Sequence, residues 1–179
     1  MSGTPSGIAD EPVPDGGYRR RTARILLVDD ADRVLLFRWP RVAGEPGAGH
    51  CWITPGGGVE QGESLRAAAA RELREETGLI VSPAALGPRV ALCSGHADLA
   101  WASGVFRDDF FLHRTAAHDV DTTGCTAFER EHITEHRWWT LDELADAREP
   151  VYPLMLAELL ADLLAGRTPA EPVRLPWRH

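Results

Sequence analysis

The sequence predicts an α+β fold within a single domain. Its 179 residues match the size of one compact domain. Several short apolar runs have the composition of β-strands, and a few longer segments have the capping residues and apolar spacing of α-helices. Hydrophobic residues make up 44% of the chain and charged residues 26%, which is ordinary for a folded globular protein.

The two ends of the chain differ in composition from the middle. Residues 1–17 are rich in glycine, proline, serine and aspartate and contain almost no apolar side chains. A segment of this kind buries too little surface to order itself, so we expect a flexible N-terminal tail there. The folded domain is expected over residues 18–166, and an irregular, proline-rich C-terminal tail over residues 167–179.

Runs of β-forming apolar residues predict the strands in chain order. Residues 22–29 and 33–39 flank the tripeptide Asp30-Ala31-Asp32 and are expected to form a hairpin. Residues 41–50 contain a proline and three glycines and are expected to form a loop. Further strands are predicted at residues 51–54, 79–81, 89–93, 105–114 and 133–139.

Capping residues predict the helices. Residues 64–77 are the strongest prediction, because Ser64 is a good N-cap, four alanines follow, and Gly78 stands just past the C-terminus. The sequence from Thr140 to Glu143 has the pattern of a capping box that opens a short helix. A final helix is expected over residues 153–165, with its leucines on one stripe. That stripe either closes the core or forms a dimer contact, so we expect a monomer or a homodimer.

Charge and composition exclude several function classes. The 27 acidic and 19 basic residues give a net charge of −8, so the chain lacks the basic surface that duplex nucleic acid requires. All basic residues are arginines, which excludes Schiff-base chemistry and a P-loop lysine. No apolar run is long enough to span a bilayer, and no secretory signal is evident. We therefore expect a cytoplasmic protein without membrane contact. Its three widely spaced cysteines are expected to be reduced thiols.

Three acidic residues share one side of the predicted helix at residues 64–77. At about 100° per residue, Glu76 lies about 40° to one side of Glu72, and Glu75 about 60° to the other. Two arrangements would relieve the repulsion between these carboxylates. Neighbouring arginines neutralise a solvated face, or divalent cations such as magnesium or manganese bind among the carboxylates. The helix alone favours the solvated face. The glycine-rich turn before it favours the cations, because such a turn lets backbone approach a phosphate and offers carbonyl ligands.

The same segment resembles the Nudix box, in which a glycine, a glutamate and an R-E-aliphatic-x-E-E-x-G-aliphatic run recur at fixed spacing. Every specified position is filled here, by Gly57, Glu63, Arg71, Glu72, Leu73, Glu75, Glu76, Gly78 and Leu79. Residues 52–60 and 137–144 also resemble the segments that usually flank this box. The chain is therefore similar to MutT-like Nudix hydrolases over residues 18–166. The resemblance implies the family's α/β/α sandwich, with a mixed β-sheet between the box helix and another helix.

The resemblance also implies a reaction and its residues. It implies that a phosphoanhydride bond is hydrolysed in a nucleoside diphosphate linked to another group, by in-line attack of a water on a metal, Mg²⁺ or Mn²⁺. The implied ligands are Glu72, Glu75, Glu76 and the Gly56 carbonyl, with Glu76 as the central one. The implied supporting residues are Glu63, which acts indirectly, and Arg71, which orients carboxylates. The alternative is a non-catalytic Nudix-like domain that senses a nucleotide. Such a domain would have lost box carboxylates, and none is lost here.

Two further functional groups are expected outside the box. Many family members recruit another acid from a downstream loop as metal ligand or general base. Here Glu131 is the first candidate for this acid and Glu129 the second, while Glu135 is expected to be a surface residue of the following strand. A solvated loop with surplus acids is the competing interpretation. Arg38, near the end of the second predicted strand, either holds a substrate phosphate or is an ordinary surface arginine.

Overall fold

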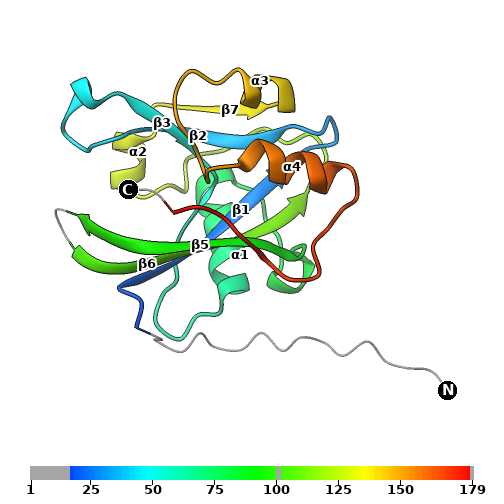
Figure 1. Ribbon diagram of the computed structural model, residues 1–179, viewed down its shortest axis with the longest axis horizontal. Helices are drawn as coiled ribbons and strands as arrows, with labels where there is room; N and C mark the ends of the chain where they lie inside the picture. Colours follow the sequence, from blue (N-terminus) through cyan, green and yellow to red (C-terminus); the bar gives the residue numbers. More distant parts are fainter. Residues whose placement is uncertain (1–16, 100–101, 178–179) are drawn as a thin grey trace.

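The computed structural model describes residues 17–99 and 102–177 (Figure 1). Nearly all of the expected N-terminal tail lies outside the described residues. The strands are β1 (Arg20–Val28), β2 (Val34–Pro40), β3 (His50–Ile53), β4 (Gly56–Gly58), β5 (Arg89–Leu99), β6 (Ala102–Arg114), β7 (Glu135–Trp139), β8 (Val151–Tyr152) and β9 (Val173–Arg174). The α-helices are α1 (Leu65–Thr77), α2 (Ala127–His132), α3 (Leu141–Ala145) and α4 (Leu156–Leu164), and short 3-10 turns occur at η1 (Pro46–Ala48) and η2 (Pro83–Ala85).

A mixed sheet forms the centre of the molecule. Its strands follow the order β8-β3-β2-β1-β6-β5-β9, while β4 also pairs with β1 and β7 with β2. β1 runs parallel to β6 in continuous register from Arg20 opposite Phe106 to Val28 opposite Arg114. β1 is antiparallel to both β2 and β4. The predicted α+β fold with a mixed sheet is confirmed.

The central strand β1 buries both of its faces, because successive side chains of a strand point to opposite sides of the sheet. Ile25 packs in one core cluster with Leu73 of α1, and Leu26 packs in a second cluster with Leu160 of α4. Figure 1 shows α1 and α4 on different sides of β1. Helices therefore cover the sheet from both sides, which confirms the expected α/β/α sandwich.

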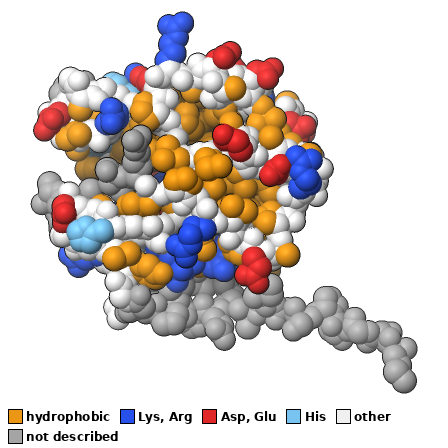
Figure 2. Space-filling view, in the orientation of Figure 1, with side chains coloured by type: hydrophobic (Ala, Val, Ile, Leu, Met, Phe, Trp, Pro, Cys, Tyr) orange, Lys and Arg blue, Asp and Glu red, His pale blue; other side chains and the backbone are white. Residues whose placement is uncertain are grey.

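The last helix closes one of these two cores. Leu159, Leu160 and Leu163 of α4 are all buried against the sheet, so the interpretation that this helix completes the core is confirmed. It begins at Leu156 rather than at residue 153, because β8 pairs with β3 just before it and a turn follows. Figure 2 shows hydrophobic side chains gathered on the face of the molecule that carries α4.

Two expectations for irregular and extended segments are wrong. Residues 79–81 do not form a strand; Ile80 is 82% exposed, while Leu79 and Val81 pack against the α1 side of the core. The C-terminal segment is not wholly irregular, because β9 pairs in parallel with β5 and Leu175 beyond it is buried. No helix in the described part of the chain is both long and apolar enough to cross a membrane.

Candidate functional site

Helix α1 carries the acidic residues, and its two ends are fixed as predicted. The Ser64 hydroxyl accepts a hydrogen bond from the Ala67 N–H at 3.1 Å. Gly78 ends the helix in the left-handed conformation, with φ 73°, and its N–H donates to the Arg74 carbonyl. A residue with a side chain is disfavoured in that conformation, so glycine suits this position. These caps fix which residues of α1 face the sheet.

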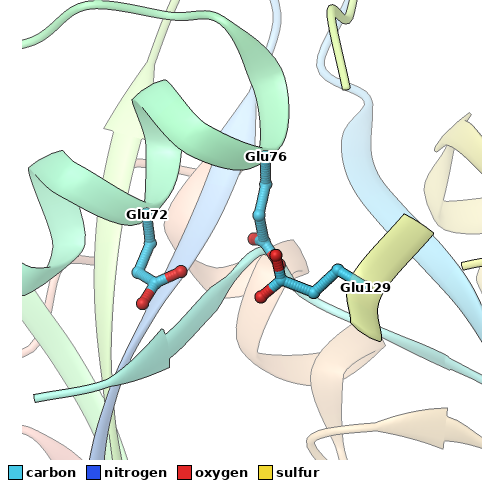
Figure 3. A group of neighbouring side chains, drawn as sticks. All are labelled: Glu72, Glu76 and Glu129. Atoms are coloured by element: carbon cyan, nitrogen blue, oxygen red, sulfur yellow. The ribbon is translucent and has the colours of Figure 1, made fainter. Parts of the chain in front are cut away.

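Two box carboxylates of α1 are buried beside a third from another helix. Glu72 and Glu76, one turn apart, are 5% and 3% exposed. Each of Glu72, Glu76 and Glu129 offers a carboxylate oxygen, and these oxygens lie within 4.8 Å of one another. Figure 3 shows the side chains of α1 and α2 pointing toward one another. Three like charges this close, two of them buried, need a positive partner or a proton.

Burial shapes the protonation of this group of three carboxylates. It raises the pKa of Glu76 to about 8, although the Gly56 N–H and the nearby Arg24 act in the opposite direction. Burial also raises the pKa of Glu72, against the stabilising hydrogen bond and charge of Arg71. At neutral pH, the cluster therefore retains a proton on Glu76 unless a cation replaces it.

The glycine turn of β4 approaches these carboxylates closely. The Gly56 N–H donates to Glu76 Oε2 at 2.6 Å, and the Gly56 carbonyl accepts a hydrogen bond from Arg24 Nη1 at 2.7 Å. A Cβ on Gly56 would lie 2.2 Å from the Ala23 carbonyl oxygen, and one on Gly57 would lie 2.5 Å from Glu72 Oε1. Gly56 therefore requires glycine, because backbone atoms block a Cβ and its φ is 130°, whereas a Cβ on Gly57 would displace the Glu72 carboxylate. The carbonyl expected to bind metal faces an arginine.

Arg71 ties several carboxylates to the turn. Its guanidinium donates to Glu72 Oε1 at 2.7 Å, to Glu75 Oε2 at 3.2 Å and to the Gly58 carbonyl at 2.8 Å. It also binds Glu63 through both carboxylate oxygens, at 3.1 and 3.0 Å. The hydrogen bonds to Glu63 raise the pKa of Arg71, although its partial burial opposes this. The guanidinium is therefore fixed in its charged form among the acids.

Glu75 and Glu63 lie outside the group of three carboxylates. The Glu75 side chain is 29% exposed and pairs with Arg71, and more loosely with Arg74 at 3.6 Å. Glu63 is bound by Arg71, and this bonding lowers its pKa even though partial burial acts the other way. The expected supporting contact between Glu63 and Arg71 is present. Glu75 differs from Glu72 and Glu76 in facing outward.

The third member of the group, Glu129, comes from α2, a helix that was not among the predicted elements. Of the two downstream candidates, the structure brings Glu129 to the cluster rather than the favoured Glu131. Glu131 is exposed and lies about 200° further around α2. Glu135 is exposed on β7, as expected. The spacing of Thr126 and Glu129, whose side chains form a full capping box, could have predicted the start of α2 but not its approach to α1.

The loop before α2 is docked on the C-terminal end of α1. The Asp121 N–H donates to the Thr77 carbonyl at 3.0 Å, and His118 Nε2 lies 2.7 Å from the same oxygen. A Cβ on Gly124 would lie 2.6 Å from the Glu75 carbonyl oxygen. These contacts hold the loop against the helix that carries the box, and so position Glu129 toward it.

Arg38 does not face the acidic cluster. Its Nε donates to Glu149 Oε2 at 2.8 Å, and a second guanidinium nitrogen binds the other carboxylate oxygen. Trp52 Nε1 donates to the same Glu149 oxygen at 2.8 Å. The hydrogen bonds that Arg38 donates to Glu149 raise the pKa of Arg38. A bidentate partner therefore holds this guanidinium, while the phosphate contact, one of the two alternatives for Arg38, stays a prediction.

A cavity of about 710 Å³ lies beside the cluster. Its lining includes Arg20, Thr22 and Arg24 of β1, Asp108 of β6, and aromatic side chains such as Trp39 and Trp177. Arg20 interacts electrostatically with Glu72 and Glu129, and Arg24 with Glu76. Burial lowers the pKa of Arg20, with the neighbouring Arg24 as a second cause. Arg20 and Arg24 therefore connect the cavity with the acidic cluster, because both line the cavity and both interact with acids of the cluster.

The three cysteines are free, as predicted, and all three are buried. Burial raises the pKa of Cys93 to about 12 and that of Cys125 to about 11, and it also raises the pKa of Cys51. A thiol must lose its proton to act as a nucleophile or a metal ligand. None of the three has the environment of a catalytic cysteine.

Comparison with known proteins places this geometry in a family. A family model described as the NUDIX domain matches residues 18–159. The NAD-capped RNA hydrolase NudC of Stutzerimonas stutzeri is 31% identical over 156 residues, which cover 86% of this chain and 49% of that protein. The uncharacterized Nudix hydrolase YvcI of Bacillus subtilis is 42% identical over 67 residues, which cover 37% of each chain. The chain thus spans half or less of the length of these curated relatives.

Solved structures show the same fold. The solution structure of the E. coli ORF135 protein matches 89% of this chain and 99% of its own, with a TM-score of 0.59 and 22% sequence identity. At this identity the likeness concerns the arrangement of strands and helices. It agrees with the mixed sheet and flanking helices described above.

Proposed function

Because this chain belongs to the Nudix domain family, we propose that it is a metal-dependent pyrophosphohydrolase. Its substrate class is a nucleoside diphosphate linked to a further group, and the bond cleaved is the phosphoanhydride. The observation that carries the proposal is the convergence of carboxylate oxygens of Glu72, Glu76 and Glu129 within 4.8 Å, close to two arginines that line a cavity.

The donor set fits a divalent cation such as Mg²⁺ or Mn²⁺. Carboxylate oxygens are the ligands that these hard ions prefer. The buried Glu76, whose pKa is about 8, would exchange its proton for such an ion. We propose that Glu72, Glu76 and Glu129 hold it, with Glu75 at the edge of the site. A cation bound there lowers the pKa of a water and shields the phosphate oxygens.

The chain's own residues bind and orient around that site. Arg71 keeps Glu72 and Glu75 in place through charge-assisted hydrogen bonds. Arg20 and Arg24, which line the cavity and interact with acids of the cluster, supply positive charge, and a diphosphate needs such charge on a protein whose net charge is −8. Glu129, which α2 directs into the cluster, is the proposed fourth acid of the family pattern in place of Glu131.

Hydrolysis assays test this function. Purified protein with Mg²⁺ or Mn²⁺ is incubated with deoxynucleoside triphosphates, oxidised nucleotides, ADP-ribose, NADH, nucleotide sugars and dinucleoside polyphosphates, and the released phosphates are separated by ion exchange. We expect turnover of at least one of these substrates, with loss of most activity in Glu76→Gln. Glu158→Gln, an exposed acid on α4, is the matched control and should keep full activity.

A paired comparison on α2 tests the identity of the downstream acid. Glu129→Gln should lower activity by about tenfold or more, whereas Glu131→Gln should leave it unchanged, because only Glu129 of this pair reaches the cluster. Nucleotide binding without turnover of any substrate, with either metal, would identify the non-catalytic sensor instead.

A further inference from the structure

The floor of the 710 Å³ cavity carries one carboxylate, Asp108 of β6. Strand register places it opposite Thr22 of β1 and opposite Cys93 of β5. The Thr22 hydroxyl donates to Asp108 Oδ1, and Cys93 Sγ lies 3.9 Å from Oδ2 in a weak thiol contact. Asp108 is thus held from both neighbouring strands, with its side chain directed into the cavity. A carboxylate fixed in this way has a defined direction for further hydrogen bonds.

Flat apolar side chains surround that carboxylate. Phe106 and Phe110 stand on either side of it along β6, and Trp39 and Trp177 contribute walls. The Trp177 indole lies over Gly95, where an added Cβ would come within 2.0 Å of the indole ring. Aromatic walls and one polar acceptor are suited to a planar heterocycle that stacks and donates hydrogen bonds.

The hydrogen-bonding capacity of the Asp108 carboxylate indicates which donors a bound heterocycle must offer. An ionised carboxylate accepts at about four lone-pair positions and donates none. Thr22 and Cys93 use two of these positions, which leaves two for a ligand. Guanine offers two adjacent donors, the N1–H and the 2-amino group. Adenine and cytosine place a ring-nitrogen lone pair beside their amino group, and the carboxylate would repel that lone pair. Thymine and uracil flank one N–H with two carbonyl oxygens, which the carboxylate would also repel.

We propose that Asp108 is a specificity-determining residue, which reads the N1–H and 2-amino edge of a guanine-type base. This inference rests on the proposed function, because it assigns the base of the nucleotide substrate to the cavity beside the carboxylates. Arg20 interacts electrostatically with Asp108 as well as with Glu72 and Glu129. It therefore lies within electrostatic reach of both the base site and the acidic cluster, and its positive charge would suit the diphosphate of a bound nucleotide.

Binding of mononucleotides tests the inference without catalysis. GMP, AMP, CMP, IMP, which lacks the 2-amino group, and N1-methyl-GMP are titrated into the full-length protein in EDTA, with tryptophan fluorescence as the signal. We expect GMP to bind about tenfold to a hundredfold more tightly than AMP or CMP, with IMP and N1-methyl-GMP also weakened, since each loses a hydrogen bond that the site is built to accept. Equal binding of GMP and AMP, or of GMP and N1-methyl-GMP, overturns the proposal.

A substitution with a complementary ligand separates recognition from folding. Asp108→Asn keeps the acceptor for Thr22 but presents an N–H where the second oxygen was. The variant should lose GMP affinity and gain affinity for XMP, whose base has a carbonyl at position 2, so that the GMP-to-XMP preference reverses. Asp98→Asn, on an exposed stretch of β5, is the matched control and should keep the wild-type preference. An Asp108→Asn protein that still prefers GMP refutes the assignment. If this variant does not fold, the base series on the wild-type protein decides the question.

The two proposals fail in distinguishable ways. Hydrolysis that requires Glu76 but shows no guanine preference would overturn the role of Asp108 and leave the proposed function intact. Selective GMP binding with no hydrolysis of any substrate would overturn the proposed function and leave Asp108 as the base-reading residue of a binding protein.

Discussion

Replacing Glu76 by glutamine separates the stability of the site from its chemistry. Glu76 is 3% exposed, and burial raises its pKa from the ordinary 4.5 to about 8. Between these two values the unfolded chain releases the Glu76 proton while the folded protein keeps it. The favourable contribution of the protonated side chain is therefore complete below pH 4.5 and is lost as pH rises through about 8.

The size of this loss follows from the shift. At about 1.4 kcal/mol per pKa unit, the interval from 4.5 to about 8 corresponds to about 5 kcal/mol of unfolding free energy. Glutamine does not titrate, and its carbonyl oxygen can still accept the Gly56 N–H. Metal-free Glu76→Gln protein should therefore become more stable than metal-free wild type as pH rises. With metal added, the variant should lack most of the proposed hydrolytic activity.

Urea denaturation in EDTA, followed by circular dichroism at pH 5, 6, 7, 8 and 9, measures the effect. We expect the difference between Glu76→Gln and wild type to grow by about 4 kcal/mol across this range in favour of the variant. Glu158→Gln should run parallel to wild type at every pH, because Glu158 is exposed. Parallel curves for Glu76→Gln and wild type would refute the account of a buried, protonated carboxyl.

Three further outcomes follow from the same site. Mg²⁺ should raise the melting temperature more at pH 8 than at pH 6, because the ion replaces the proton on Glu76. The apparent affinity for Mg²⁺, measured by calorimetry, should rise up to about tenfold per pH unit below pH 8. An affinity that does not change with pH would contradict this. Arg71→Lys should weaken Mg²⁺ binding about tenfold to a hundredfold, because lysine cannot reproduce the forked bonds to two carboxylates. Gly124→Ala should lower the free energy of unfolding in urea by about 1–3 kcal/mol and weaken metal binding, because its Cβ would lie 2.6 Å from the Glu75 carbonyl oxygen. Gly47→Ala is the control: a Cβ there meets open space, so neither stability nor metal binding should change.

Local patterns were sufficient to predict most of the fold. The capping residues of α1 lie within the helix sequence itself, so both ends could be predicted from Ser64 and Gly78. The strands of the sheet centre are continuous apolar runs, because both faces are buried, and such runs are visible in the sequence. β9 has no such signal. It is two residues long, both residues are exposed, and it forms because a sheet edge is available for pairing.

The site was predictable in part for the same reason. Glu72 and Glu76 are one turn apart on one helix, so their proximity follows from helix geometry alone. The approach of Glu129 depends on a loop that docks on the end of α1, and no spacing in the sequence encodes that contact. The partner of Arg38 is equally hidden, since Glu149 lies 111 positions away.

Burial distinguishes the two interpretations that the acidic helix face first allowed. A solvated face would leave Glu72, Glu75 and Glu76 similarly exposed, each paired with a neighbouring arginine. Instead the residues differ in burial. Glu75 faces outward and pairs with Arg71 and Arg74. Glu76 is buried, and the Gly56 N–H and the nearby Arg24 only partly offset the rise in its pKa that burial causes. A buried carboxyl with a raised pKa lowers the stability of the metal-free protein at neutral pH. A bound cation would offset that cost, so the burial of Glu76 supports the proposed cation site rather than a solvated acidic face.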